Sequence, residues 1–505
     1  MRARVNEILN RYPTVGLAVG VVRDGRLEFF YGHGVADIAS KTPITEDTVF
    51  RIASITKTFT AIAVMQLWER GLIDLDAPAN EYLRAYQLIP SKSSFRPATV
   101  RHLLTHTAGV PEEVRPSDAF RPDFGESYRL GQTLPTLAEY YHGGLRLAAE
   151  PATRFIYTDH GFATLGQIVE DVSGKRLERY FSERIFEPLG MADTSLDRSE
   201  LVKSRLATGY NLRSGGAKAV TDRQWVTAAA SSIYSTPRDM ARYIAALVGG
   251  GANEHGSVLK PATLANMFKP HYQPDGRVPG IGLAFSRFNL GGHLAVEHGG
   301  ILPGFNSQIF VAPDDGVGVM AFTNGARLAM FWLPNEVAGL LKHLLRVPDE
   351  AIRTDVPQHP EIWNDICGWY KLSGRLSDAR ARLSAGAGAE VFVHAGQLTL
   401  RGLSPIPALY TGFPLHPDDD TDPYVFRIDL SEFGIGTARV VFSRDPGGAV
   451  TRVHLDLMPL TFLKQPAIGN PRLWMTGVVG ALAAAAMATA VLRRRTTSRR
   501  KLQAG

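Results

Sequence analysis

The spacing of hydrophobic residues predicts buried helices in the first half of the chain. Residues 53–68, ASITKTFTAIAVMQLW, contain no Gly or Pro and place apolar side chains on every face of a helix, and the sequence ERG at 69–71 ends the pattern. Such a segment is typical of a helix surrounded by other structure. Residues 160–174, HGFATLGQIVEDVSG, predict a second apolar helix, and Tyr157 lies on the loop that enters it.

Shorter hydrophobic runs next to glycine or proline predict strands. Residues 294–298 (LAVEH) and 306–313 (NSQIFVAP) are two of them. Within residues 360–465, segments such as YVFRIDL and TRVHLDL alternate apolar and polar positions, and a turn sequence, Asp-Pro-Gly-Gly at 445–448, separates strand signals. This alternation predicts a small antiparallel barrel or sandwich. The intervening segment 347–359 (VPDEAIRTDVPQH) is rich in proline and charge, so we predict a linker there.

A hydrophobic segment lies near the end of the sequence and a basic one follows it. From Leu473 to Leu492 there are twenty residues without a charge, and the tail at 493–505 is basic. At 1.5 Å per residue, a helix of this length spans about 30 Å, the thickness of a bilayer core. An amphipathic or packed helix is the alternative, but the segment has no polar stripe. We therefore predict a transmembrane helix over 473–492.

Composition bounds the size and the partners of the protein. With 505 residues, of which 45% are hydrophobic, the chain can bury one large core and a second, smaller one. The net charge is +6, but the stretch from Pro471 to Gly505 holds seven Lys or Arg and no acid, so removing its +7 leaves −1 for the rest. A nearly neutral globular part gives no reason to expect nucleic acid as a partner.

Ser54 and Lys57 are the strongest candidate pair for chemistry. Lys57 is the only charge in the apolar helix predicted over 53–68. Residues three apart share a helix face, so both side chains are expected to project from the first turn, where free backbone N–H groups favour negative charge. Such a position suits a nucleophile and its oxyanion. The ordinary alternative is an N-cap serine with a lysine that reaches outward.

The pattern Ser-x-x-Lys occurs three times, and its context separates the copies. Ser257–Lys260 precedes Pro261, and a residue before proline is pushed out of the helical region. The third copy, Ser498–Lys501, lies in the basic tail. The copy at Ser54 is therefore the candidate nucleophile.

Two further motifs complete an ordered set. Tyr157-Thr158-Asp159 lies at the entry to a helix, and His298-Gly299-Gly300 follows a short strand, where glycines let a substrate backbone approach closely. With SITK, YTD and HGG in this order, the chain resembles the serine β-lactamase-related hydrolases, which include class C β-lactamases, DD-peptidases, D-aminopeptidases and family VIII esterases. SITK matches the family's Ser-x-x-Lys, YTD stands in the place of Tyr-x-Asn, and HGG stands in the place of Lys-Thr-Gly or His-x-Gly.

Flanking segments extend the resemblance. GLAVGVVRDGRLEFFYGHGVAD is similar to the family's opening hairpin, TVRHLLTHTAGV to the segment after the nucleophile helix, and GVGVMAFTNG to the closing strand. The resemblance runs from about residue 5 to about residue 345. It implies an α+β fold, in which an antiparallel sheet flanked by helices joins an all-α cluster and the nucleophile lies between them.

The resemblance also implies a mechanism. Ser54 attacks an acyl carbonyl and holds the acyl group, while Lys57 and Tyr157 move the proton, because an unassisted serine hydroxyl needs an adjacent base. The backbone N–H groups of Ser54 and Ile301, the residue just after HGG, form the oxyanion hole. A second, water-mediated step releases the acid. Gly299, Gly300, His298 and Asp159 are the expected substrate-binding residues.

Two departures from the family pattern bear on substrate choice. Asp159 stands where the family commonly has Asn, and a carboxylate accepts hydrogen bonds but donates none. Its charge favours the ammonium form of Lys57, so we expect Tyr157 to be the base. His298 stands where a Lys would hold a substrate carboxylate, and it lacks a permanent charge near neutral pH. Both changes argue against efficient β-lactam hydrolysis and are compatible with ester, short amide or D-amino-acid peptide substrates.

Other candidate sites are weaker. His102 and His106 stand four apart on a predicted helix, but no third ligand with zinc spacing is found in the sequence, so structural histidines are favoured. Cys367 is the single cysteine, which excludes an intrachain disulfide. The sequence has no Gly-x-Ser-x-Gly, Walker or HExxH motif. We expect neither a cofactor nor a metal.

The expected protein is a membrane-anchored serine hydrolase. A β-lactamase/transpeptidase-like domain covers 1–346, and the linker at 347–359, a small β-barrel-like domain at 360–465, the transmembrane helix and the basic tail follow. The substrate is a small-molecule or peptide ester or amide. A DD-carboxypeptidase or D-aminopeptidase acting on cell-wall-type peptides is one alternative, and a catalytically degenerate scaffold or ligand-binding protein, suggested by Asp159, is another. The sequence leaves the oligomeric state open.

The predicted orientation in the membrane contains a conflict. The basic tail should stay in the cytoplasm, which places the catalytic domain outside. The first residues, MRARVNEILNRYPTVG, however, lack the apolar core of a signal peptide. Either the assigned start omits a leader, or the domain is cytoplasmic and tail-anchored. We expect an extracytoplasmic domain, because most members of the family that the chain resembles act on envelope or extracellular substrates.

Overall fold

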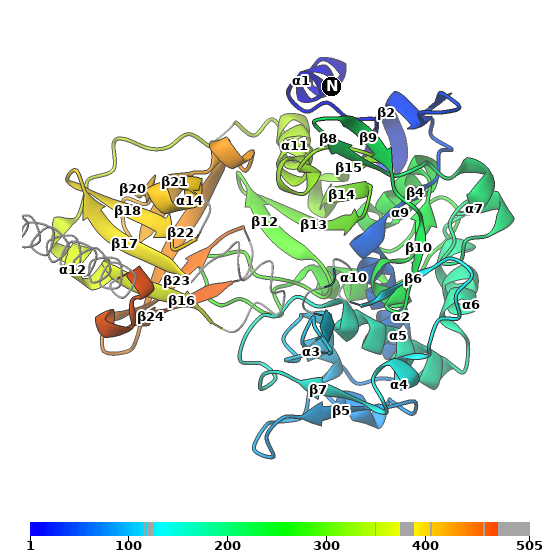
Figure 1. The fold of residues 1–505 in the computed structure, drawn as a ribbon, viewed down its shortest axis with the longest axis horizontal. Helices are drawn as coiled ribbons and strands as arrows, with labels where there is room; N and C mark the ends of the chain where they lie inside the picture. Colours follow the sequence, from blue (N-terminus) through cyan, green and yellow to red (C-terminus); the bar gives the residue numbers. More distant parts are fainter. Residues whose placement is uncertain are drawn as a thin grey trace, which may run out of the picture.

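The protein has a larger domain built on a seven-stranded sheet and a smaller domain built on a nine-stranded sheet (Figure 1). This computed structural model describes residues 1–115, 117–118, 121, 125–348, 350–373, 388–404, 407–457 and 460–472. The predicted transmembrane segment 473–492 and the basic tail 493–505 lie outside the described residues. In the described part of the chain, no helix has the length and apolar character needed to cross a bilayer.

The seven-stranded sheet of the larger domain is antiparallel throughout. Its strands are β1 (Gly16–Arg23), β2 (Arg26–Asp37), β3 (Thr42–Pro43), β12 (Ser286–Leu290), β13 (His293–Leu302), β14 (Phe305–Ala312) and β15 (Val317–Thr323), in the order β12-β13-β14-β15-β1-β2-β3. Strands β1 and β15 are hydrophobic and buried along almost their whole length, because helices cover both faces of the sheet. The first and last segments of this domain thus lie side by side in its centre.

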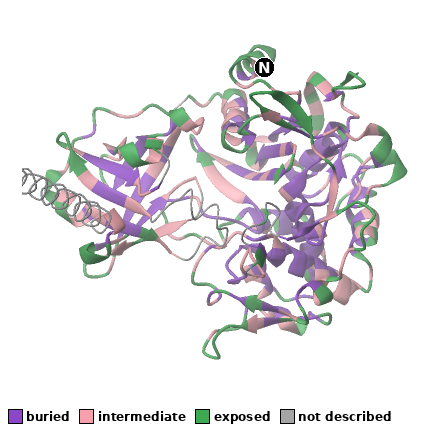
Figure 2. Ribbon diagram, in the orientation of Figure 1, coloured by how far each residue is buried: buried purple, intermediate pink, exposed green. Residues whose placement is uncertain are grey.

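Helices on the two faces bury separate cores. On one face, α1 (Arg2–Arg11) and α11 (Ala329–Leu344) share a cluster with β1, β14 and β15, and the stacked rings of Tyr12 and Trp332, 4.5 Å apart, join the two helices. On the other face, α9 (Pro237–Val248) contacts β1, β2 and β15 and belongs to the largest core, which continues into the helical cluster. Figure 2 shows buried residues concentrated in the centre of this domain, whereas most of α1 is exposed.

The helical cluster is centred on α2 (Thr56–Glu69). It packs against α5 (Asp159–Ser173) and α8 (Ala228–Ser231), and nearly all of its residues are buried, as the apolar pattern predicted. The structure differs in one respect, because residues 53–55 form a separate 3₁₀ turn, η1, before the α-helix begins. Ser54 therefore lies in the turn and Lys57 in the first turn of α2.

The remaining elements of the larger domain are short and connect its sheet and helices. They are α3 (Val100–Leu104), α4 (Leu137–Tyr140), α6 (Leu177–Phe181), α7 (Glu200–Arg205), α10 (Pro261–Phe268), β4 (Phe50–Arg51), β5 (Gln87–Pro90), β6 (Ser127–Arg129), β7 (Gly144–Leu147), β8 (Tyr210–Arg213), β9 (Gly216–Ala219), β10 (Arg223–Trp225) and β11 (Tyr234–Ser235).

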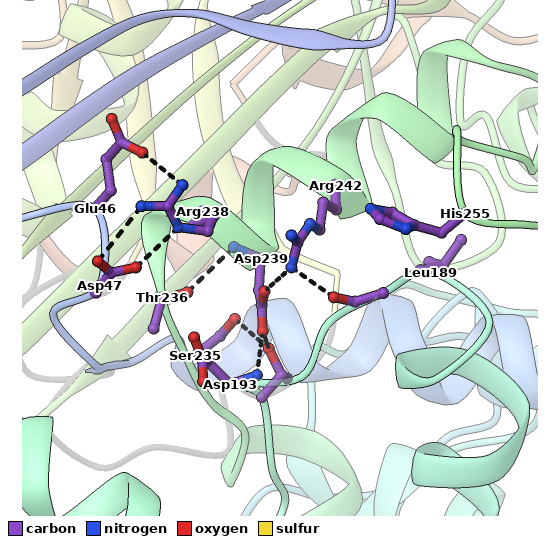
Figure 3. Close-up of polar contacts among 12 residues, drawn as sticks. Glu46, Asp47, Leu189, Asp193, Ser235, Thr236, Arg238, Asp239, Arg242 and His255 are labelled. Atoms are coloured by element: carbon purple, nitrogen blue, oxygen red, sulfur yellow. Dashed lines mark hydrogen bonds and ion pairs between the residues drawn. The ribbon is translucent and has the colours of Figure 1, made fainter.

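A polar network fixes the start of α9 between the sheet and the helical cluster (Figure 3). The Thr236 side chain caps the helix by accepting from the backbone N–H of Asp239 at 3.1 Å. The fully buried Asp239 carboxylate accepts from the backbone N–H of Asp193 at 2.7 Å and from the Arg242 guanidinium at 2.9 Å. Arg238, one residue earlier, pairs with Asp47 at 2.8 Å. Because the buried carboxylate has these partners, its burial is tolerated.

The smaller domain is a strongly curved antiparallel sheet that is nearly closed into a barrel, which confirms the predicted barrel-like module. Its strands are β16 (Gly368–Leu372), β17 (Ala389–His394), β18 (Gln397–Gly402), β19 (Phe413–Pro414), β20 (His416–Pro417), β21 (Val425–Asp429), β22 (Thr437–Arg444), β23 (Val450–Leu455) and β24 (Thr461–Gln465), with the short helices α12 (Trp363–Ile366) and α14 (Pro407–Thr411). In the order β19-β18-β17-β16-β24-β23-β22-β21-β20, the outer strand β19 also approaches β21. The interior is filled by apolar residues that include Tyr370, Phe426 and Phe442.

The boundaries between the predicted domains fall between regular elements. Helix α11 ends at Leu344, the first strand of the second sheet begins at Gly368, and its last strand ends at Gln465. The boundaries predicted from the sequence at 346, 360 and 465 stay predictions.

Candidate active site

Lys57 lies at the centre of a polar cluster at the start of α2. Its side chain is 0% exposed, yet all three donors of the ammonium group have an acceptor. The group donates to Ser54 Oγ at 3.0 Å, to Asp159 Oδ1 at 2.6 Å and to the backbone carbonyl of Ala230 at 3.3 Å. A buried lysine is tolerated only with such compensation. The structure therefore brings together the two motifs that the sequence placed about a hundred residues apart.

The residue before the candidate nucleophile has an unusual backbone. Ala53 has φ +49°, in the left-handed region that side chains other than glycine rarely adopt. It is fully buried and packs against Trp225 and Leu302. Such a conformation costs on the order of 1–3 kcal/mol and persists only when the surroundings enforce it. Here the packing against β10 and β13 holds the turn that presents Ser54.

Tyr157 lies directly above the lysine. The Lys57 ammonium is 4.8 Å from the centre of the Tyr157 ring, and the phenol has polar contacts with Lys57 and Ser54. On its other side the ring stacks on His106, with centroids 4.4 Å apart. Thr158 caps α5 by accepting from the backbone N–H of His160 at 3.2 Å, and its own N–H donates to His106 Nδ1 at 3.3 Å. The Tyr157 ring thus lies between Lys57 and His106, and the backbone of the next residue is also bonded to His106.

The charges at the site act on both candidate bases in the same direction. Burial lowers the pKa of Lys57, but attraction by Asp159 and Tyr157 outweighs it, so the pKa is raised above its ordinary value. Burial raises the pKa of Tyr157, Lys57 lowers it and Asp159 raises it, with a net increase. At neutral pH both groups are therefore protonated in the resting site. The prediction that Asp159 favours the ammonium form agrees with these directions, whereas a resting Tyr157 phenolate does not.

Carboxyl groups that the sequence did not single out surround Asp159. Glu112 accepts from the backbone N–H of Asp159 at 3.0 Å, and burial together with the charges of Asp159 and Glu126 raises its pKa well above the ordinary range. Glu126 lies 3.2 Å from His160 Nε2 and accepts from the Thr227 hydroxyl at 2.7 Å. Burial also raises the pKa of Glu126. The first turn of α5 is therefore held by a buried acidic layer.

The His298-Gly299-Gly300 motif lies inside β13 and does not follow its end. The predicted strand stopped at His298, but its hydrogen-bonded ladder with β14 continues to Leu302. Glycine is required at position 300, because a Cβ there would lie 2.3 Å from the carbonyl oxygen of Ile52 and 2.3 Å from Ser307 Oγ. This close approach places β13 against the turn that holds Ser54.

His298 is buried and uncharged. Its Nδ1–H donates to the backbone carbonyl of Gly299 at 2.7 Å. Burial, followed by repulsion from Lys57, lowers its pKa to about 3. The position is neutral at physiological pH, in agreement with the expectation from the sequence. Lys57 is thus the only cation found in contact with Ser54 among the residues that the structure describes.

One edge of β13 is open next to these residues. Strand β12 pairs with residues 293–297, and in the described parts of the chain no strand pairs with that edge beyond residue 297. Leu302 and Phe305 close a two-residue hairpin and form its hydrogen-bonded pair, so the N–H of Ile301, one residue earlier, points to the open edge. The Ile301 residue is 54% exposed. The edge can therefore receive an extended group.

The alternative candidates lie elsewhere. His102 forms a capping box with Thr99 at the start of α3. In the second Ser-x-x-Lys copy, Ser257 donates to the Gly251 and Leu259 carbonyls, and Lys260 has an extended backbone, as expected before a proline. Cys367 is a half-buried thiol at the start of the smaller domain. His106, which was considered as a metal ligand, instead stacks on Tyr157.

The chain is similar in sequence to several known proteins. The sequence profile described as Beta-lactamase matches residues 1–340. A human protein, "Putative beta-lactamase-like 1", is 26% identical over 348 residues, covering 67% of this chain and 66% of its own. The "Beta-lactamase" of Escherichia coli (strain K12) is 29% identical over 254 residues, covering 48% of this chain and 60% of its own. The chain thus spans about two thirds or less of the length of these curated relatives.

Solved structures show the same fold. The octameric penicillin-binding protein homologue from Pyrococcus abyssi has a TM-score of 0.57 and 24% identity, with 92% of this chain and 99% of that chain covered. The Beta-lactamase/D-alanine Carboxypeptidase from Yersinia pestis, complexed with citrate, has a TM-score of 0.54 and 22% identity, with 68% of this chain and 99% of that chain covered. The first match extends over both domains, and the second covers a smaller share of the chain.

Proposed function

This chain belongs to the Beta-lactamase family, and we propose that it is a serine hydrolase that cleaves esters or amides through an acyl-enzyme on Ser54. The observation that carries this proposal is the set of contacts of one buried group. The Lys57 ammonium reaches Ser54 Oγ, the Asp159 carboxylate and the face of the Tyr157 ring. A nucleophile and its proton acceptors within hydrogen-bond reach are what acyl transfer requires.

The proton of Ser54 leaves through Tyr157 and Lys57. Both groups are protonated at rest, so one must first lose a proton to act as the base. Since Lys57 is tied to Asp159, we assign the base to Tyr157, whose deprotonated form the adjacent ammonium would stabilise. Attack by Ser54 Oγ forms the bond to the acyl carbon while the phenolate takes the hydroxyl proton. That proton then passes to the leaving group, and water repeats the sequence to release the acid.

The developing oxyanion is stabilised by backbone N–H groups. The N–H of Ser54 lies in the 3₁₀ turn that precedes α2, and the N–H of Ile301 points to the open edge of β13. Preorganised donors of this kind are each worth about 10²–10³ in rate. The close contact at Gly300 keeps the two donors at a fixed separation.

The charges at the site favour an acyl compound without a carboxylate near the reacting carbonyl. His298 is neutral, and Lys57 is already paired with Asp159, so neither of these two residues offers a free positive charge to hold such a carboxylate. Simple esters and short amides fit this charge balance. β-Lactams, whose carboxylate needs a cation, are expected to react poorly.

A DD-carboxypeptidase or D-aminopeptidase is the second candidate. The open edge of β13 at residues 298–302 favours it, because an extended peptide can add to such an edge by main-chain hydrogen bonds. The similar structure from Yersinia pestis, described as a Beta-lactamase/D-alanine Carboxypeptidase, supports the same substrate class. In this reading, the protein acts on D-amino-acid peptides of the cell-wall type.

We also propose that residues 473–492 anchor the protein in a membrane, with the catalytic domain outside. The support is the charge-free composition of this segment and the basic residues after it. The full chain should stay with membranes after alkaline extraction, whereas a chain ending at residue 472 should be released. Release of both would contradict the anchor.

Covalent labelling of the full chain tests the central proposal. Intact-protein mass spectrometry should show one adduct with a fluorophosphonate, and the Ser54→Ala variant should show none. Penicillin, offered in parallel, separates the candidates, because labelling by penicillin favours the peptidase and its absence favours the esterase. Absence of any adduct would favour a catalytically degenerate scaffold instead.

A further inference from the structure

The smaller domain binds a loop of the larger domain. Residues 271–281, here called the bridging loop, connect α10 to β12. Within it, the Arg277 guanidinium pairs with Asp275 at 2.8 Å and reaches across to Asp422 at 2.7 Å and to the carbonyl of Phe442 at 2.9 Å. The Asp275 carboxylate accepts a hydrogen bond from Ser443 of β22. The planar guanidinium thus satisfies groups on both domains at once.

An apolar contact lies beside this ion pair. Val278 of the bridging loop packs against Val425 of β21 and Val441 of β22, and all three side chains are buried. The loop is therefore docked on the barrel by both polar and apolar contacts, and it is not a free surface segment.

The other end of the bridging loop contacts the segment that precedes Tyr157. The Tyr272 hydroxyl has polar contacts with the backbone of Phe155 and with the side chain of Thr461 in β24. The rings of Tyr272 and Phe155 are nearly parallel, with centroids 6.5 Å apart. Phe155 lies two residues before Tyr157, and its ring contacts His106 at 5.6 Å. His106 in turn stacks on Tyr157.

We infer that the barrel domain acts through the bridging loop to position Tyr157, with Tyr272 as the positioning residue. This inference rests on the proposed function. A row of neighbouring rings, Tyr272, Phe155, His106 and Tyr157, leads from the bridging loop to the candidate base. Misplacing a catalytic group by 1 Å can reduce the rate about 10²-fold. The contacts that hold the segment before Tyr157, here called the brace, therefore affect acyl transfer directly.

Two variants of the full chain test the brace at its two ends. Tyr272→Phe keeps the ring and removes the hydroxyl that contacts Phe155 and Thr461. Asp422→Asn weakens the ion pair with Arg277 on the barrel side. Tyr31→Phe, which removes a hydroxyl bonded to Asn6 at 2.9 Å, is the matched control for the first variant. Asp420→Asn, which weakens an exposed ion pair with Arg353, is the matched control for the second.

Kinetics and hydrogen exchange give independent readouts. We expect Ser54 in both test variants to be phosphonylated by a fluorophosphonate, and acylated by a chromogenic ester, about ten-fold more slowly. The KM for the ester should change less than two-fold, since a positioning defect affects the chemical step. The backbone amides of Ile156 and Thr158, which donate to His106, should exchange faster in both variants. Both controls should match the wild type in rate and exchange.

Each outcome bears on a different conclusion. Unchanged exchange at Ile156 and Thr158 in both test variants would overturn the brace, whatever the activity. Faster exchange without slower acylation, in a wild type that turns over substrate through Ser54, would overturn its role in positioning. A wild type without Ser54-dependent turnover would instead refute the proposed function. A fall in melting temperature that accounts for all of the lost activity would reduce the contact to a purely structural one and would also count against the inference.

Discussion

The ion pair between Lys57 and Asp159 is the feature of the site whose effect can be worked out most directly. The two charges are 2.6 Å apart, the lysine is fully buried and the Asp159 side chain is 17% exposed. With an effective dielectric constant of 20, Coulomb's law gives an attraction of about 6 kcal/mol at this distance. In the Asp159→Asn variant an amide oxygen can still accept from Lys57, so we expect about half of this attraction, about 3 kcal/mol, to be lost.

This loss converts into a shift in pKa with a definite sign. Each unit of pKa corresponds to about 1.36 kcal/mol, so 3 kcal/mol is about two units. Asp159 raises the pKa of Lys57 and also that of Tyr157. Removing its charge therefore lowers both, and the expected direction is the same whichever group is the base.

Ser54 of the Asp159→Asn variant should be acylated faster than Ser54 of the wild type near neutral pH. A pKa about two units lower increases the deprotonated fraction of the base about 100-fold, and with a Brønsted slope of about one half the weaker base loses about ten-fold of that gain. We therefore expect about a ten-fold faster acylation by penicillin at pH 7, and a rate profile whose rising limb lies about two pH units lower.

Acylation rates measured from pH 5 to 10 by rapid-quench mass spectrometry would check this. Asp171→Asn is the matched control, because Asp171 lies on the same helix but accepts from the backbone N–H of Arg84, away from Lys57. A midpoint that moves by less than half a unit, or a rate at pH 7 that stays equal or falls, would refute the electrostatic reasoning. A shift of the same size in the control would also refute it.

Three further predictions concern other parts of the structure. Gly300→Ala should lower the free energy of unfolding by about 1–3 kcal/mol and slow acylation by more than ten-fold, because the new Cβ clashes with Ile52 and Ser307. Denaturant unfolding and ester turnover measure the two effects, and values close to the wild type would contradict the prediction. Tyr157→Phe should slow acylation about 10²–10⁴-fold with little change in melting temperature, and a smaller kinetic effect would exclude the phenol as the base. Burial lowers the pKa of His454 to about 4, so the neutral imidazole contributes stability that is fully present above pH 6.5 and is lost as the pH falls towards 4. In His454→Gln, the free energy of unfolding should depend on pH less steeply in this range, by about 1.4 kcal/mol per pH unit. Urea unfolding at several pH values measures this slope, and an unchanged slope would contradict the prediction.

The sequence predicted the parts of the site that carry a local signal. The buried helix was visible because α2 has apolar residues on all faces, and Lys57 stood out as the only charge within residues 53–68. The family resemblance was carried by short motifs whose order is preserved, and the structure brings Ser54, Lys57 and Asp159 into contact. The barrel was visible in the alternating pattern of strands such as β21 and β23.

Other parts depend on tertiary contacts that no local pattern shows. Glu112 and Glu126 lie in a segment without helical or strand periodicity, and only their neighbourhood to the motif TVRHLLTHTAGV could have drawn attention to them. The glycines at 299 and 300 suggested the end of a strand, because glycine commonly interrupts one, whereas pairing with β14 carries β13 through them. The bridging loop pairs residues about 150 positions apart, and its polar sequence gives no sign of a docked segment.

The docked bridging loop also changes what the segment at 347–359 means for the protein as a whole. Its proline-rich and charged composition suggests a flexible connection between two independent units. Removing the smaller domain at this segment would expose Val278 and leave Arg277 without Asp422. The catalytic fragment would then carry an exposed apolar patch beside a charge that has lost its partner on the barrel. We therefore expect the two domains to unfold in one cooperative transition. If this barrel were replaced by another during evolution, the bridging loop would also have to change. We therefore expect the barrel and the bridging loop to evolve together.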